Sequence, residues 1–196
     1  MYMRAKFPLH VFNPIDTLHF GPDDFDRRNW NPDEITSMDK SLKNGNSCTP
    51  SDAVEYGHLF LPLMKIDFGG GDTGFIVAQG DTNHLWIYEG RNTYVYMYDK
   101  NSKGLKIAYE LAWGGAGEGP WYETDSWILD LNKDSKPDIL TRATGEWGLN
   151  DFNGEWHSFS KDTLTAVTWN DTGFVNMKVL NPDSLKKIYK TYFRSN

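Results

Sequence analysis

The chain has 196 residues and a mass of 22.5 kDa, which is enough for one domain with a buried core. Hydrophobic residues make up 39% of it and aromatic residues 15%, which excludes a disordered chain, and no run of apolar residues is long enough to span a membrane as a helix. The 20 basic and 27 acidic residues leave a net charge of −7, so we expect no nucleic-acid partner and no binding to anionic lipid.

The first 30 residues are predicted to form a loop-rich entry to the domain. They show no regular hydrophobic period, and Pro8, Pro14 and Pro22 interrupt any long helix or strand. No charged segment followed by an apolar run occurs here, so the pattern of a signal peptide is absent. Both an intracellular protein and a secreted protein whose signal has been removed fit this sequence.

Two short helices are predicted, at 31–45 and 182–193. Each begins with asparagine, proline and an acid, where the asparagine caps the helix, the proline suits its first turn and the acid complements the helix dipole. Gly45 ends the first helix because glycine tolerates the left-handed conformation that follows a helix. The second helix has one apolar face at helical spacing, made by Leu185, Ile188, Tyr189 and Tyr192.

Between the helices, residues 60–180 have the two-residue period and the turn composition of β-strands. The tetrapeptide Asp-Thr-Gly-Phe occurs at 72–75 and again at 171–174, which indicates related hairpins. We therefore expect a single domain over 1–196 that is mainly β, with antiparallel sheets in a partial propeller or twisted sandwich and short N- and C-terminal helices. The predicted strands are 75–78, 85–88, 94–98, 105–113, 127–129, 139–141, 164–169 and 174–179.

The chemistry that the sequence specifies best lies in one acidic segment. Residues 121–155 contain eight acids and three bases, and within them oxygen-bearing side chains alternate along a short loop. Calcium takes six to eight hard oxygens, whereas zinc and copper favour histidine and cysteine. The sequence therefore predicts a calcium site completed by water, with an acidic turn that binds no metal as the alternative. Its predicted ligands are Asp130, Asn132, Asp134, the backbone carbonyl of Lys136, and Asp138.

This segment is not an EF-hand, because position 12 is Thr141 instead of glutamate and both flanks have strand patterns. From Trp127 to Leu140 it resembles the calcium loop of FG-GAP/VCBS repeats, the blade motif of integrin-type β-propellers. Residues 165–175 are similar to the hairpin that often follows such a loop. The resemblance implies a calcium-stapled turn between two strands of a blade. Ser135 departs from the family, which has glycine there.

The glycine-rich stretch 68–74 is predicted to form a hairpin or bulge. It lacks the lysine of a phosphate-binding loop and precedes a strand, which disfavours a nucleotide site. It also resembles the Gly-Gly-Gly-Asp stretch of some SMI1/KNR4-like immunity domains, with 94–99 similar to their later aromatic strand. That resemblance implies a protein-binding role.

Signals of catalysis are weak. The five histidines lie far apart, no serine lies in a nucleophile elbow, and Cys48 is the only cysteine. A carboxylate pair for glycoside hydrolysis stays open, because the fold and not the sequence sets its spacing. We therefore predict no catalytic residues.

Aromatic residues stand among Gly, Asn and Asp over 144–160, which is typical of a long loop. We predict that Trp147, Phe152 and Trp156 bind a partner, because exposed rings anchor interfaces. The expected function is a calcium-stabilised, non-catalytic domain that binds a protein, as an inhibitor or immunity protein against a toxin or hydrolase would. A carbohydrate-binding module that uses Trp147 and Trp156, and a hydrolase, remain alternatives. The modest calcium affinity of extracellular modules favours the periplasm or exterior.

Overall fold

The computed structural model confirms a mainly β protein with a short C-terminal helix. The helix predicted at 31–45 and the strand predicted at 85–88 lie outside the described residues, as does Cys48. No helix in the described part of the chain is long and apolar enough to cross a membrane. The structure describes residues 9–21, 58–81, 91–99, 103–116, 121–150 and 152–191.

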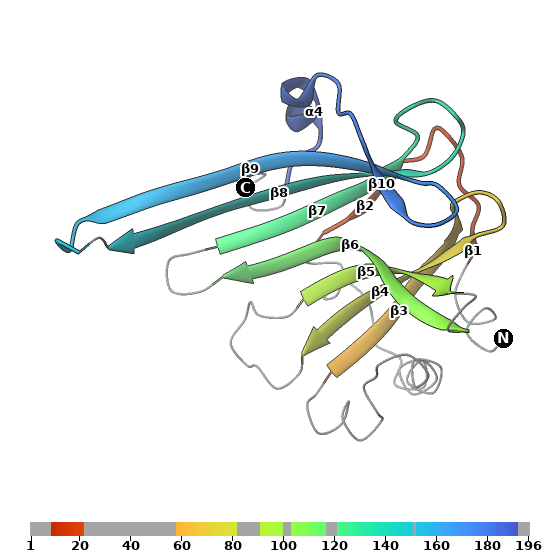
Figure 1. The fold of residues 1–196 in the computed structure, drawn as a ribbon, viewed down its shortest axis with the longest axis horizontal. Coiled ribbons are helices and arrows are strands. Elements are labelled where there is room, and N and C mark those ends of the chain that lie inside the picture. The colour runs from red at the N-terminus through yellow and green to blue at the C-terminus, as the bar shows by residue number, and fades with distance from the viewer. Residues whose placement is uncertain are drawn as a thin grey trace.

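The strands form one ten-stranded sheet, shown in Figure 1. Its order is β1-β3-β4-β5-β6-β7-β8-β9-β10, with β2 paired to β7 outside this path. Every pairing is antiparallel except that of β1 with β3. The strands are β1 (Leu9–His10), β2 (Leu18–Phe20), β3 (His58–Asp67), β4 (Thr73–Asp81), β5 (Arg91–Asp99), β6 (Gly104–Ala116), β7 (Trp121–Leu129), β8 (Asp138–Asn150), β9 (Trp156–Trp169) and β10 (Phe174–Met177).

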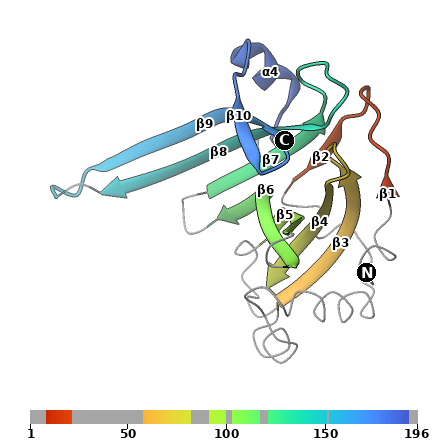
Figure 2. The ribbon, with the colours of Figure 1, turned by 45° about the vertical axis from the view of Figure 1, so that its right-hand side comes forward.

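The sheet divides between β6 and β7. Only Trp113–Ala116 of β6 pair with β7, whereas β2 pairs with β7 at Ser126–Ile128. Two register shifts between β5 and β6 strengthen the local twist. As a result, β3–β6 curve beneath β7–β10, as Figure 2 shows. The main core joins both parts and includes Ile76 and Val95 from one and Ile128, Ile139 and Val167 from the other.

A second cluster covers the opposite face of β7–β9. Helix α4 (Pro182–Ile188) and the segment after it lie on this face, where the ring of Tyr189 contacts that of Trp127 at 5.1 Å between centroids. The helix begins where the sequence predicts, but the predicted end at residue 193 is wrong. Tyr189 leaves the helical conformation at φ −94° and ψ 88°, since its backbone carbonyl and ring are both held against the sheet.

Strands β8 and β9 are the longest, with 13 and 14 residues, and their hairpin extends past the rest of the sheet (Figures 1 and 2). Pairing with β7 stops at Glu146, after which β8 and β9 pair only with each other among the described residues. The prediction of a long loop over 144–160 is therefore wrong. Alternation of the aromatic side chains between the two faces makes a hairpin, and only its tip turns.

Candidate functional site

The predicted calcium loop is the connection between β7 and β8. It leaves the sheet after Leu129 and returns at Asp138, and these two residues are paired across the strands. Lys133 and Ser135 both have left-handed backbone conformations, at φ 65° and 67°. These two residues curl the loop tightly, so that the side chains of Asp130, Asn132 and Asp134 accept hydrogen bonds from the loop's own backbone.

Hydrogen bonds hold the curled shape. Asp130 accepts one bond on each carboxylate oxygen, from the amides of Asp134 at 3.1 Å and Ser135 at 2.9 Å. Asn132 Oδ1 accepts from the amide of Asp134 at 2.9 Å, and Asp134 Oδ1 accepts from the amide of Lys136 at 2.9 Å. The loop is thus organised around the side-chain oxygens at the first, third and fifth positions.

Asp138 lies at the base of the loop and is 0% exposed. Its Oδ2 accepts from the amides of Leu131 at 3.0 Å and Asn132 at 3.4 Å, whereas Oδ1 is buried with no hydrogen-bond partner. Burial raises the pKa of this carboxyl, and the charge of Asp134 adds to the rise. The hydrogen bonds from the amides of Leu131 and Asn132 oppose that rise in pKa. A buried carboxylate with one unsatisfied oxygen is costly unless a cation accompanies it.

The residues of this loop fit a calcium ion. Their donors are carboxylate, amide and carbonyl oxygens, and each carboxylate oxygen that accepts one or two amide bonds keeps further acceptor capacity. Over the described ranges, no three His, Cys, Asp or Glu side chains are already gathered as a metal shell. Binding would therefore require the side chains of Asp130, Asn132, Asp134 and Asp138 to come together around the ion, with the Lys136 carbonyl beside them.

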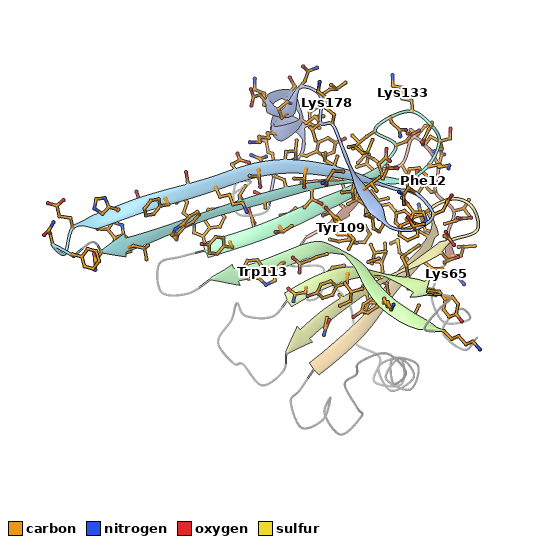
Figure 3. All side chains as sticks on the ribbon, in the orientation of Figure 1. Phe12, Lys65, Tyr109, Trp113, Lys133 and Lys178 are labelled. Atoms are coloured by element: carbon orange, nitrogen blue, oxygen red, sulfur yellow. The ribbon has the colours of Figure 1, made fainter. Side chains whose placement is uncertain are left out.

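The end of the β8–β9 hairpin carries the aromatic residues that the sequence singles out. Phe152 is 111% exposed, and Leu149 and Trp156 are each 61% exposed. Figure 3 shows side chains standing on both faces of this hairpin. These large apolar side chains are therefore in contact with solvent near the end of the hairpin.

Trp147, the third aromatic residue predicted to bind a partner, is less exposed than Phe152 and Trp156. It lies in a ladder of rings that crosses four strands, in which neighbouring centroids are 5.5–6.0 Å apart. Because both neighbours in the ladder hold it, Trp147 stiffens the hairpin more than it presents a free ring. The ladder comprises Trp113 on β6, Tyr122 on β7, Trp147 on β8 and Phe159 on β9.

Trp156 lies on the opposite face of the hairpin from Trp147. Trp147 pairs with Phe159 and Asn150 pairs with Trp156, so the two tryptophans belong to alternate rows of side chains. The ring of Trp156 covers Gly148, where an added Cβ would lie only 1.8 Å from a ring atom. The two tryptophans therefore cannot stack together on one sugar chain.

Sequence reasoning missed a polar cluster on the face that α4 covers. Arg142 is buried and donates through Nε and Nη2 to both carboxylate oxygens of Asp162, at 3.0 Å each, while its Nη1 donates to the carbonyls of Lys186 and Tyr189 at 2.7 Å. On β7, Oδ1 of the buried Asp125 lies within hydrogen-bond distance of His19 Nε2, at 2.7 Å. These partners are far apart in the chain, so no local pattern reveals them.

Family models, curated protein sequences and solved structures yield no match to this chain. The geometry of the loop and of the hairpin is thus the basis for inferring what the protein does.

Proposed function

We propose that this protein is a non-catalytic binding domain, stabilised by calcium at the Asp130–Asp138 loop, that docks to another protein through the tip of the β8–β9 hairpin. The observation that carries the docking proposal is the exposure of Leu149, Phe152 and Trp156 on a hairpin that extends beyond its neighbouring strands. Tryptophan is among the side chains that most often dominate binding energy at protein interfaces, and phenylalanine is enriched there.

The hairpin is built to bind with little loss of conformational freedom. Thirteen paired positions join β8 and β9, from Asp138 opposite Thr168 to Asn150 opposite Trp156. The ladder through Trp147 adds ring contacts across the strands near the tip. A surface that is ordered before it meets its partner loses less free energy on binding.

Calcium would act at the other end of the same strand. Asp138 is the first residue of β8 and also a predicted ligand, so an ion in the loop would fix the base from which the hairpin extends. A bound cation would also compensate the buried carboxylate of Asp138, whose Oδ1 has no partner. The proposed role of the ion is structural support.

The charge of the chain favours a basic partner. The net charge is −7, and the exposed Glu155 directly precedes Trp156 in the chain. An acidic surface speeds encounter with a positively charged cleft, and inhibitors and immunity proteins that cover the active site of a nuclease or similar toxin use this chemistry. We therefore propose an inhibitor or immunity protein as the specific class. Association should then slow as salt concentration rises.

The experiment compares three purified, calcium-loaded baits in an extract of the native host and its competitors. They are the wild type, a Phe152→Ser/Trp156→Ser variant, and a Val175→Ser/Leu180→Ser control that removes exposed apolar residues from the body of the protein. The proposal expects a protein that the wild type and the control retain and the hairpin variant loses, and that then binds the purified wild type directly. Identical capture by all three baits would contradict docking through the hairpin.

A further inference from the structure

Three loops meet at the end of the sheet opposite the hairpin tip (Figure 1). The indole Nε1 of Trp169, at the end of β9, donates to Asp72 Oδ2 in the β3–β4 loop at 3.1 Å. A Cβ added to Gly70 would lie 3.3 Å from Asp171 Oδ1, in the β9–β10 turn. The Lys136 side chain of the calcium loop lies equally close to Gly69. The two copies of Asp-Thr-Gly-Phe thus face each other across one space.

That space is an open cavity of about 710 Å³, within the size range of sites for small ligands. One wall is formed by the ends of β5 and β6 and includes the apolar side chains of Tyr98 and Ile107, each about half exposed. The other walls are polar, and three glycines, Gly70, Gly71 and Gly173, form part of them. The polar lining side chains are Asp72, Thr73, Lys106, Asp171 and Thr172, with Trp169 beside them.

We propose that this cavity binds a neutral saccharide unit. Carboxylates accept hydrogen bonds from sugar hydroxyls, and the Lys106 ammonium donates to their oxygens. The aromatic and aliphatic wall suits the C–H faces of a pyranose ring. The combination of a few convergent polar groups with an apolar wall is characteristic of a site for a polar organic molecule of this size.

The charge of the lining selects against other ligands. The lining holds two carboxylates and one ammonium, and the Lys136 side chain lies beside Gly69, so the charges nearly balance and suit a neutral ligand better than an anion. The glycines of the β3–β4 loop allow a ligand to come close to the backbone. Gly70 and Gly71 have φ of 63° and 80°, and a Cβ on Gly71 would meet no atom within 4 Å, so its backbone is open to the cavity.

The turn that carries Asp171 is held in place before any ligand arrives. Asn170 Oδ1 accepts from the amides of Thr172 at 3.2 Å and Gly173 at 3.1 Å, and from the Thr172 hydroxyl at 2.8 Å. Asp171 itself has φ 71° and is exposed. Its carboxylate is therefore presented by a fixed backbone, which reduces the ordering that binding requires.

This site is distinct from the protein-docking surface, because it lies at the other end of β8 and β9 and uses none of the hairpin's exposed rings. It also differs from a sugar platform made by Trp147 and Trp156, which lie on opposite faces. Failure of saccharide binding would leave hairpin docking intact, and the reverse also holds.

The test is a calorimetric titration of calcium-loaded protein with the methyl pyranosides of glucose, galactose, mannose, xylose and N-acetylglucosamine, each up to tens of millimolar. We expect at least one of them to bind. Asp171→Gly removes the carboxylate without backbone strain, and it should weaken that binding by about tenfold or more. Asn181→Gly, another exposed residue with positive φ but outside the cavity, should leave binding unchanged.

Inorganic phosphate and putrescine serve as the anionic and cationic probes. No heat from any of the five glycosides, or equal binding by the wild type and Asp171→Gly, would overturn the proposal. Preferential binding of phosphate or putrescine at the same cavity would overturn it as well.

Discussion

Asp138→Asn separates the cost of a buried carboxylate from its use as a calcium ligand. The substitution keeps an oxygen that can accept from the amides of Leu131 and Asn132, and it removes the charge at a side chain that is 0% exposed. Without calcium, the wild type buries an oxygen that lacks a hydrogen-bond partner. With calcium, the proposed site loses one of its three carboxylates in the variant.

Relative to the wild type, Asp138→Asn should be more stable in chelator and less stable in saturating calcium. In chelator, an unsatisfied buried polar atom costs about 1–3 kcal/mol, and because the new amide itself needs an acceptor we expect a net gain of only about 1 kcal/mol. At 100 times the dissociation constant, calcium should stabilise the wild type by about 2.7 kcal/mol, which is roughly 5–11 °C for a chain of this length. Asp138→Asn should lose most of this stabilisation by calcium.

The assay is thermal unfolding of the wild type and of Asp138→Asn, each in chelator and in saturating calcium. Asp183→Asn is the control, since it makes the same change to an exposed carboxylate in the first turn of α4. The reasoning would be refuted if Asp138→Asn were less stable than the wild type in chelator, or if calcium stabilised both by the same amount.

Ser135→Gly should raise the free energy of unfolding by about 1 kcal/mol in denaturant titrations, because Ser135 has φ 67°, and an unchanged or lower midpoint would argue against backbone strain there. Phe152→Ser should change the free energy of unfolding by no more than about 0.5 kcal/mol, because Phe152 is 111% exposed, and a large loss in the same titration would mean that this ring packs in the folded state. Arg142→Met should cost roughly 2–3 kcal/mol, because it removes the donor of two backbone carbonyls and one of the partners of Asp162, and a near-neutral denaturant midpoint would contradict this. The raised pKa of Asp138 means that the folded state binds its proton more tightly, so its contribution in chelator should favour folding below pH 3.8 and be lost as pH rises through the raised value. The difference in stability between the wild type and Asp138→Asn should show this slope, and a slope of the opposite sign would contradict it.

The sequence was sufficient to predict the parts of the fold that depend on local pattern. The alternation of Tyr94, Tyr96 and Tyr98 lies within β5, and the Asn-Pro-Asp start at Asn181 begins α4. The loop between Leu129 and Asp138 also forms where its spacing indicates, with Ser135 in the left-handed conformation that glycine would adopt more easily. In each case the determining interactions lie within a few residues.

The parts that depend on distant partners could not be read in this way. Gly, Asn and Asp around Trp147 are typical of a loop, yet pairing with Phe159 and stacking on Tyr122 extend the hairpin through this region. The proposed cavity brings together Asp72 and Asp171, about a hundred residues apart, and only the curvature of the sheet places them in one space. Pairing across strands, and not local propensity, decides both features.

The central claim is that the Asp130–Asp138 loop binds calcium, and a calorimetric titration of calcium into chelator-treated protein measures this most directly. The account predicts saturable binding of one ion per chain that is lost in Asp134→Ala and retained in Asp183→Ala, whose carboxylate lies outside the loop. Absence of binding by the wild type, or equal binding by Asp134→Ala, would contradict it.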